Sequence, residues 1–353
     1  MSLLDTLGLR LPIFQGPMTG SDTPQLAAAV SAAGGLGQLG CGMRSPAAMR
    51  EAAAAVRAAT DRPFSLNLFV QDTPAPDAAT VQAAQERLAP LYAAFGQQPA
   101  TPARWCEDFA AQFDTLVELR PAVASFTFGI LTAQQVERLH GAGCFVIGTA
   151  TTVAEALAWA GVGADAVVAS GLEAGGHRAT FLGDADASMV GTMALVPACV
   201  DALRIPVIAA GGIMDGRGIA AARALGAQAV QMGTAFLACP ESAIGPAYRA
   251  ALARAQATDT RTTRAITGRH ARGIVNTLMR HTDAQVDQVP AYPVQNALTG
   301  ALRRVAAEAG NADYLALWAG QGVAAARAVP AGELVALLER EWRDASKNIA
   351  ASA

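Results

Sequence analysis

Short apolar runs alternate with longer Ala-rich, charge-dotted segments along the chain as far as about residue 237. This alternation is typical of repeated βα units and a parallel sheet. We expect strands at residues 12–18, 35–39, 64–70, 123–128, 145–149, 166–170, 206–210 and 229–234, separated by helices such as those at 45–59 and 215–225. Eight such strands predict an α/β fold, a closed (β/α)8 TIM barrel. An open doubly wound sheet is the alternative.

The even spacing breaks after the third expected strand. Residues 72–120 form a Pro-rich insertion with an amphipathic helix around 107–119. Loops that follow barrel strands lie on the rim where active sites form, so we expect this insertion to be a helical lid. Residues 239–353 lack the βα rhythm, and we expect a helical C-terminal extension that covers the barrel mouth and forms a small second domain with the insertion. Residues 1–71 and 121–238 are then the barrel.

Composition and charge exclude several classes of protein. The 353 residues are 52% hydrophobic and 16% charged, which indicates a large buried core rather than a disordered scaffold. A formal net charge of −3 argues against a nucleic-acid partner, so we interpret the arginines between Arg261 and Arg280 as a solvated rim or a dimer surface. The uncharged run at 23–43 is rich in Ala and Gly and predicts a buried helix and strand, not a membrane span.

Other features point to an intracellular enzyme without a metal. The five cysteines lie far apart, and none forms a C-x-x-C or Cys/His pair at metal-ligand spacing. The N-terminus lacks the basic start and apolar core of a signal peptide, so we expect a cytoplasmic protein. The single lysine, Lys347, lies near the C-terminus, which argues against a Schiff-base aldolase.

Glycines end the last two expected strands, at Gly211-Gly212 and at Gly233. Glycine lets a ligand approach the backbone, and a helix that starts at Asp215 would offer free N–H groups and the positive end of its dipole. Either glycine turn alone fits an ordinary βα connection. Together, after adjacent strands, they favour a phosphate-bearing ligand.

A histidine follows two glycines after the sixth expected strand, in Glu173-Ala-Gly-Gly-His177. We expect His177 on a loop at the barrel rim, where a neutral imidazole accepts a proton near physiological pH. Met18 and Asn67 lie at the same end of the first and third expected strands. An apolar support and an amide at a barrel mouth suit a flat heteroaromatic ring. We also place Tyr248 and Tyr292 near this mouth.

Several motifs together resemble the class I nitronate monooxygenases, formerly called 2-nitropropane dioxygenases. The motifs are QGPM at 15–18, AAAVSAAGGLG at 27–37, LNL at 66–68, EAGGH at 173–177, IAAGGI at 208–213, VQMGTAFL at 230–237, YPVQN at 292–296 and WAGQ at 318–321. The EAGGH, GGI and QMGT motifs are also similar to those of flavin-dependent enoyl-ACP and quinone reductases. The resemblance to nitronate monooxygenases in particular rests on the first motif, QGPM, and on the last ones, YPVQN and WAGQ.

The resemblance implies that the cofactor is FMN and that His177 is the catalytic base. The expected FMN-binding residues are Met18, Asn67, Ser170, Gly175, Gly212, Gln231, Met232, Gly233 and Thr234. The sequence departs from the family pattern at two positions. Ser170 stands where the family commonly has Gln and is too short for the same amide contact, and Gly300 stands where it tends to have a basic residue after Leu298-Thr299.

The activity implied is FMN-dependent oxidation of alkyl nitronates, or of nitroalkanes, by O2 to a carbonyl compound and nitrite. The expected partners are a small-molecule nitronate and O2, in a homodimer, with neither nucleic acid nor membrane. A flavin-dependent NAD(P)H enoyl-ACP or quinone reductase is one alternative. A barrel that binds flavin or phosphate without catalysis is another.

Overall fold

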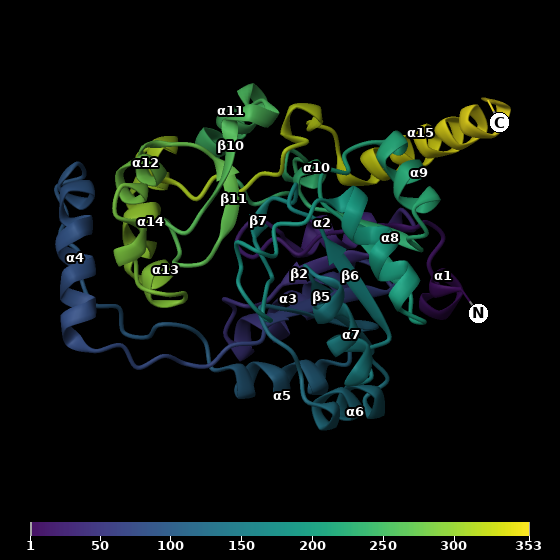
Figure 1. The fold of residues 1–353 in the computed structure, drawn as a ribbon, viewed down its shortest axis with the longest axis horizontal. Helices are drawn as coiled ribbons and strands as arrows, with labels where there is room; N and C mark the ends of the chain where they lie inside the picture. Colours follow the sequence, from purple (N-terminus) through teal and green to yellow (C-terminus); the bar gives the residue numbers. More distant parts are fainter. Residues whose placement is uncertain (1, 353) are drawn as a thin grey trace.

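The computed structural model describes residues 2–352 and is built around eight parallel strands (Figure 1). They are β1 (Ile13–Gln15), β2 (Gly37–Gly40), β3 (Phe64–Phe69), β4 (Val123–Thr127), β5 (Phe145–Ala150), β6 (Ala166–Ser170), β8 (Val207–Ala210) and β9 (Ala229–Met232). Their order is β1-β9-β8-β6-β5-β4-β3-β2. A parallel bridge between Phe14 and Leu36 joins β1 to the segment before β2. The predicted α/β TIM barrel is confirmed with all eight strands, and the open sheet is wrong.

The barrel strands are buried on both faces, as the apolar runs indicated. All six residues of β3 are buried, because helices cover the outer surface while side chains fill the interior. The covering helices are α2 (Pro24–Ala32), α3 (Pro46–Ala59), α5 (Phe109–Leu119), α6 (Ala133–Gly141), α7 (Val153–Gly161), α8 (Thr192–Ala202) and α9 (Gly216–Ala224). Short helices α1 (Leu3–Leu7) and α10 (Thr234–Leu237) precede β1 and follow β9. Side-chain caps set the helix starts; the Ser45 hydroxyl, for example, accepts from the Ala48 N–H.

Two helices outside the expected barrel segments also pack against the barrel. The helix α5 contacts α3 and β3, and the last helix, α15 (Ala331–Ser352), contacts α9 and α2. Figure 1 shows α15 running along α9 and ending away from the rest of the molecule. The three-part division of the chain stays a prediction.

The insertion after β3 packs against the C-terminal part of the chain. Helix α4 (Ala78–Ala93) lies beside α13 (Val294–Leu298) and α14 (Gly300–Glu308), with α12 (Thr277–Asp283) close by (Figure 1). Leu88 and Leu91 of α4 share an apolar cluster with residues of these helices, and the Tyr92 hydroxyl donates to the Leu298 carbonyl at 2.6 Å. Segments far apart in sequence therefore form one small lobe beside the barrel.

The C-terminal extension is not purely helical, which corrects the sequence prediction. Besides α11 (Pro246–Arg254) and four 3-10 turns (Ala257–Asp259, Val286–Gln288, Ala312–Tyr314 and Val323–Ala325), it contains β10 (Thr260–Thr263) and β11 (Ala271–Ile274). Both strands are antiparallel neighbours, and β11 also pairs with β7 (Gly176–His177). β-branched residues in β10 favour the extended backbone, and the segment around His177 supplies an edge for β11. The expected loop at His177 is therefore a strand.

The arginines between Arg261 and Arg280 are not all solvated, which also corrects the prediction. Arg272 is 7% exposed, and its Nε donates to the Leu172 carbonyl at 3.0 Å. The Nε of Arg269 donates to the Arg178 carbonyl at 3.0 Å. Several of these guanidinium groups thus hold the backbone near the strand β7 in place.

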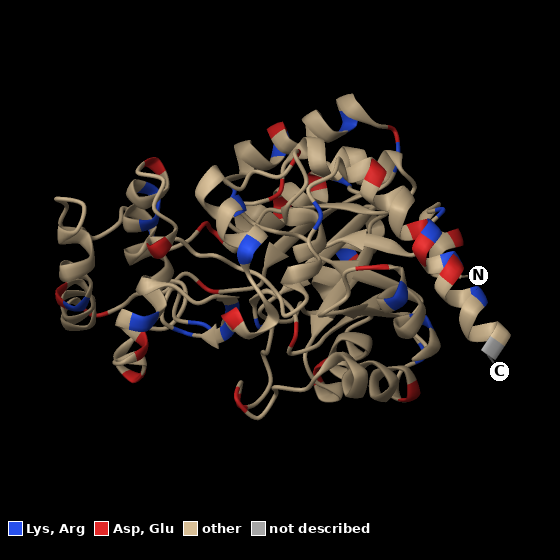
Figure 2. Ribbon diagram, turned by 90° about the horizontal axis from the view of Figure 1, so that it is seen from above, with Lys and Arg blue, Asp and Glu red and all other residues tan. Residues whose placement is uncertain are grey.

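Acidic and basic positions are interspersed on the ribbon, for example along α15 (Figure 2). Within residues 2–352, no helix combines the length and the hydrophobicity needed to cross a bilayer.

Candidate active site

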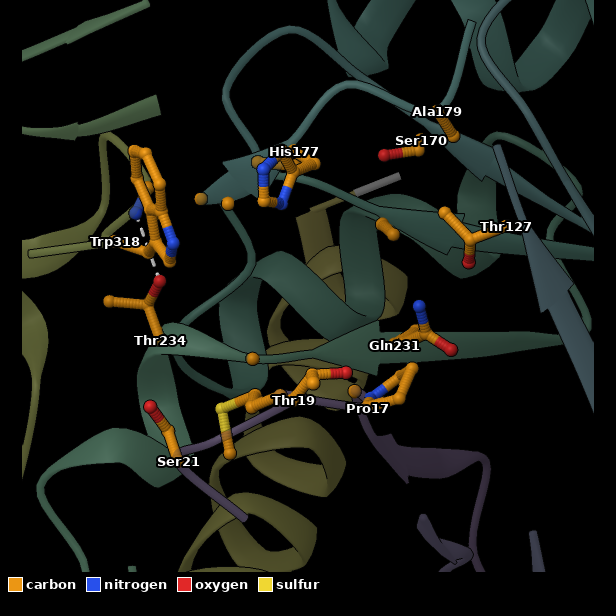
Figure 3. Close-up of a pocket in the computed structure, with 18 of the residues that line it drawn as sticks. Pro17, Thr19, Ser21, Thr127, Ser170, His177, Ala179, Gln231, Thr234 and Trp318 are labelled. Carbon is orange, nitrogen blue, oxygen red and sulfur yellow. Dashed lines mark hydrogen bonds between the residues drawn. The ribbon is translucent and has the colours of Figure 1, made fainter. Parts of the chain in front are cut away.

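One pocket lies at the carboxyl ends of the barrel strands. It brings together every predicted site residue: Met18, Asn67, Ser170, Gly175, His177, Gly212, Gln231, Met232, Gly233 and Thr234. Tyr248 and Tyr292 also line it. Figure 3 shows His177 and Trp318 facing Gln231, Thr127 and Pro17 across a common opening. Residues from eight separate strand ends and loops thus meet in a single cavity, as barrel architecture requires.

The two glycine turns present unpartnered backbone donors to this pocket. Gly211 and Gly212 have φ of 115° and 72°, in the left-handed region that favours glycine. The N–H groups of Gly212 and Gly233 donate to no other group in the described part of the chain. Because both glycines line the cavity, these two N–H groups are free to donate to a ligand with acceptor oxygens.

The helix behind these turns does not contribute free donors, which corrects the sequence argument. Helix α9 is capped by Asp215, whose carboxylate accepts from the N–H groups of Arg217 at 3.0 Å and Gly218 at 3.1 Å. The Gly216 N–H donates to the Glu341 carboxylate at 3.1 Å. Two carboxylates therefore occupy the helix start, and an anion would be held by the glycine turns themselves.

A close backbone approach closes the other side of the pocket at Gly175. A Cβ at this position would lie 2.4 Å from the backbone nitrogen of Gly320, so no larger residue fits without movement. The Gly320 N–H donates to the Thr234 hydroxyl at 2.9 Å. The Gln321 N–H donates to the Glu173 carbonyl at 2.9 Å. The WAGQ segment of the tail thus locks the EAGGH segment against the end of β9.

Amide side chains inside the barrel form a hydrogen-bonded network below the pocket. The Gln38 Nε2 donates to the Gln231 Oε1 at 2.8 Å, and the Ser125 hydroxyl donates to the Gln38 Oε1 at 3.3 Å. The Asn67 Nδ2 donates to the Ser125 hydroxyl at 3.1 Å. Because the Gln231 oxygen is engaged by Gln38, its NH2 group is left to serve as a donor at the pocket (Figure 3).

His177 lies among aromatic rings and is held by a threonine. Its Nε2 is 2.9 Å from the Thr267 hydroxyl oxygen. Ring centroids of Phe128, Tyr292 and Trp318 lie 5.3, 5.5 and 5.3 Å from that of the imidazole. These contacts and the pairing of β7 with β11 restrict the imidazole to one orientation.

Burial, followed by the positive charges of Arg269 and Arg303, lowers the pKa of His177 to about 3. The imidazole is therefore neutral at physiological pH. A neutral imidazole offers one nitrogen as an acceptor and the other as a donor.

Ser170 lines the pocket at the end of β6, and a buried arginine holds its backbone. The Arg178 guanidinium donates to the carbonyls of Ser170 and Ser188, the latter at 2.5 Å. The short Ser170 side chain leaves room where a longer amide would reach into the pocket (Figure 3).

Sequence reasoning missed several residues that shape the pocket. Phe128 directly follows β4 with a φ of 81°, an unusual value for a bulky residue, and stacks on Phe69 with ring centroids 4.3 Å apart. Arg303 lines the pocket from α14, and Thr267 reaches His177 from the loop before β11. No short motif marked these residues, because each acts through a contact between distant segments.

Comparisons with known proteins agree with this site. The family model for nitronate monooxygenase matches residues 1–341. A nitronate monooxygenase from Pseudomonas aeruginosa is 45% identical over 96% of this chain and 97% of its own. The chain belongs to the nitronate monooxygenase family. It is therefore an enzyme of a flavoprotein family of oxidoreductases.

The fold of the chain is also similar to those of solved structures. A nitroalkane oxidase from Streptomyces ansochromogenes superimposes with a TM-score of 0.91 at 40% identity, over 99% of this chain and 100% of that one. FabK from Thermotoga maritima follows with a TM-score of 0.78 at 30% identity, covering 99% and 98%. This chain and FabK therefore share one fold over nearly their whole length.

Proposed function

We propose that this enzyme oxidises alkyl nitronates with O2 to a carbonyl compound and nitrite, using bound FMN and His177 as the catalytic base. The observation that carries the proposal is the pairing of two unpartnered backbone N–H groups, at Gly212 and Gly233, with a neutral imidazole across the same pocket. The first feature suits a phosphate, and the second suits a proton acceptor.

The residues of the pocket fit FMN. Gly212, Gly233 and Thr234 would hold its phosphate through the backbone, and Asn67 and Gln231 would meet polar atoms of its ring with their amides. Met18, Ser170, Gly175 and Met232 would complete the walls, all on one cavity. When bound, FMN supplies the electron transfer and the oxygen chemistry, while the protein supplies orientation and a pocket that excludes competing reactions.

Thr267 would select the tautomer that His177 needs. The Thr267 hydroxyl lies 3.3 Å from the Arg269 carbonyl, to which it donates, and 2.9 Å from the His177 Nε2. With its single proton engaged by Arg269, this hydroxyl accepts from the Nε2–H of His177. The Nδ1 lone pair is then the free acceptor for a substrate proton.

The low pKa of His177 favours a substrate that is already ionised. A base is most efficient when its pKa is near the working pH, and the pKa of His177 lies well below it. Removing a proton from carbon is therefore difficult for this imidazole in the free enzyme. A preformed nitronate avoids that step, so we propose nitronates as better substrates than neutral nitroalkanes.

Anaerobic mixing tests the proposal. The purified protein should show the absorption spectrum of an oxidised flavin, and ethyl nitronate should bleach it without oxygen while NADH should not. After air is admitted, nitrite should appear in proportion to the nitronate consumed. Bleaching by NADH would favour a reductase instead. A flavin that neither compound reduces would favour a barrel that binds the cofactor without catalysis.

A homodimer and a cytoplasmic location stay predictions.

A further inference from the structure

Arg303 projects from α14 into the active-site pocket and is fixed by backbone and amide oxygens. Its Nη2 donates to both the carbonyl and the Oδ1 of Asn296 at 2.8 Å, and its Nε donates to the Thr299 carbonyl at 3.3 Å. Its Nη1 makes no hydrogen bond within residues 2–352. The guanidinium is thus held in place while one of its nitrogens stays available.

No carboxylate compensates this cation. Among residues 2–352, Arg303 makes no ion pair with an aspartate or glutamate, and it is the one Arg or Lys in the wall of the pocket. Arg303 stays charged although burial lowers its pKa. Buried charges are normally paired, so an unpaired guanidinium facing a cavity indicates an anionic ligand.

The other buried arginines near the site are used differently. Arg178 and Arg272 direct their guanidinium groups to backbone carbonyls, and neither lines the pocket. Arg269 donates to the carbonyls of Arg178 and Thr180 and stacks over the Phe128 ring, with its Cζ 4.3 Å from the ring centroid. Those three arginines support the wall, whereas Arg303 is part of its inner surface.

The charge of Arg303 acts where the substrate would react. Arg303, His177 and Tyr292 line the same pocket, and the charge of Arg303 adds to the burial that lowers the pKa of His177 and opposes the burial that raises the pKa of Tyr292. The rings of His177 and Tyr292 have their centroids 5.5 Å apart. An anion bound by Arg303 would therefore sit beside the imidazole.

We propose that Arg303 binds the negatively charged nitro group of the nitronate and thereby selects ionised substrates over neutral ones. This inference rests on the proposed function. It also explains how the site can lack a basic residue at Gly300, a position where the nitronate monooxygenase family tends to have one. Positions 300 and 303 are one turn apart on the same face of α14, so Arg303 supplies from the next turn the charge that Gly300 lacks.

Nitrate is a suitable probe, because it is a planar oxyanion that cannot be oxidised by this chemistry. Its affinity for the flavin-loaded enzyme is measured by calorimetry, with neutral nitroethane as the uncharged comparison. We expect Arg303→Met to weaken nitrate binding more than tenfold and nitroethane binding less than about threefold. A charge-assisted hydrogen bond supports a change of this size, since 1.4 kcal/mol corresponds to tenfold.

Two further variants separate charge from packing. Asn296→Asp keeps the guanidinium and places a carboxylate beside it, so it should weaken nitrate binding although Arg303 is intact. Arg303→Lys should recover part of the lost affinity. The matched control is Arg304→Met, because the Arg304 side chain is 67% exposed and pairs with Glu308 away from the pocket. The control should bind nitrate within about twofold of the original enzyme.

Unchanged nitrate affinity in Arg303→Met would overturn the proposal. Equal losses in Arg303→Met and Arg304→Met would overturn it too, because the effect would then be general electrostatics. So would parallel losses for nitrate and nitroethane, which indicate damaged packing. Nitrate binding needs no turnover, so an enzyme that binds nitrate through Arg303 but leaves nitronates unreacted contradicts the proposed function alone.

Discussion

The two walls of the pocket are built in opposite ways. The barrel wall consists of neutral amides and glycines at strand ends, where Gln38 orients Gln231 and Ser125 links Gln38 to Asn67. The facing wall comes from the second sheet and the small lobe, and it carries His177, aromatic rings and the cation of Arg303. The neutral wall suits a cofactor held in one pose, while the charged wall suits recognition of a reacting anion. Variants on either side should therefore affect different measurements.

The strongest test of the charged wall is His177→Asn. Loss of a positioned base should slow turnover of a neutral nitroalkane by roughly 10² to 10⁴, whereas a preformed nitronate should lose much less. Steady-state nitrite release from nitroethane and from ethyl nitronate measures both. Flavin content should stay unchanged, because the amide wall is intact. Equal losses for both substrates would contradict the assignment of His177 as a base.

The pH dependence of stability also reports on this wall. The pKa of His177 is lowered to about 3 from an ordinary 6.5. Between these two pH values, His177 is protonated in the unfolded chain and neutral in the folded protein. His177 therefore lowers the free energy of unfolding as pH falls from about 6.5 toward 3, by at most about 1.4 kcal/mol per pH unit. In denaturant titrations the stability of the original protein should fall relative to that of His177→Asn between about pH 6.5 and pH 3, and the two should run parallel above pH 6.5. Parallel curves over the whole range would show that His177 titrates normally.

The neutral wall is tested by Gln38→Leu. This change removes the partner of the Gln231 oxygen, which frees the amide to rotate, and a lost buried hydrogen bond costs about 1 to 2 kcal/mol. We expect roughly tenfold weaker flavin binding, measured by fluorescence as the apoprotein is titrated with FMN. The exposed Gln98→Leu is the control and should bind flavin normally. An unchanged flavin affinity in Gln38→Leu would show that the amide network does not contribute to flavin binding.

The smallest expected effect is that of Thr267→Val. Without the hydroxyl, the Nε2 of His177 loses its partner at 2.9 Å, and the tautomer with a free Nδ1 is no longer favoured. A neutral hydrogen bond contributes about 1 kcal/mol, so the rate with nitroethane should fall about fivefold. Thr267→Ser should restore most of it. A larger loss in Thr267→Ser than in Thr267→Val would show that the hydroxyl does not orient the imidazole.

The same contrast explains which parts were predictable. All eight strands follow the local pattern of short apolar runs, whereas most of the ten predicted site residues were assigned through the resemblance to the family's motifs. The capped start of α9 was not predictable, since Glu341 reaches Gly216 from the last helix. Likewise β11 is a strand because residues 176 and 177 offer it an edge, and β10 pairs with the other side of β11. Arg272 gave no sign of burial, because its partner is a carbonyl one hundred residues away.

The sequence by itself determined the barrel, the glycine turns and the identity of the histidine, because hydrophobic periodicity and backbone flexibility are local properties. Only the tertiary structure decided that His177 is neutral and that Arg303 faces the pocket without a carboxylate. Both depend on burial and on charges brought together from distant segments. Electrostatic free energy depends on distances through space and on desolvation, and neither can be read from the amino-acid sequence.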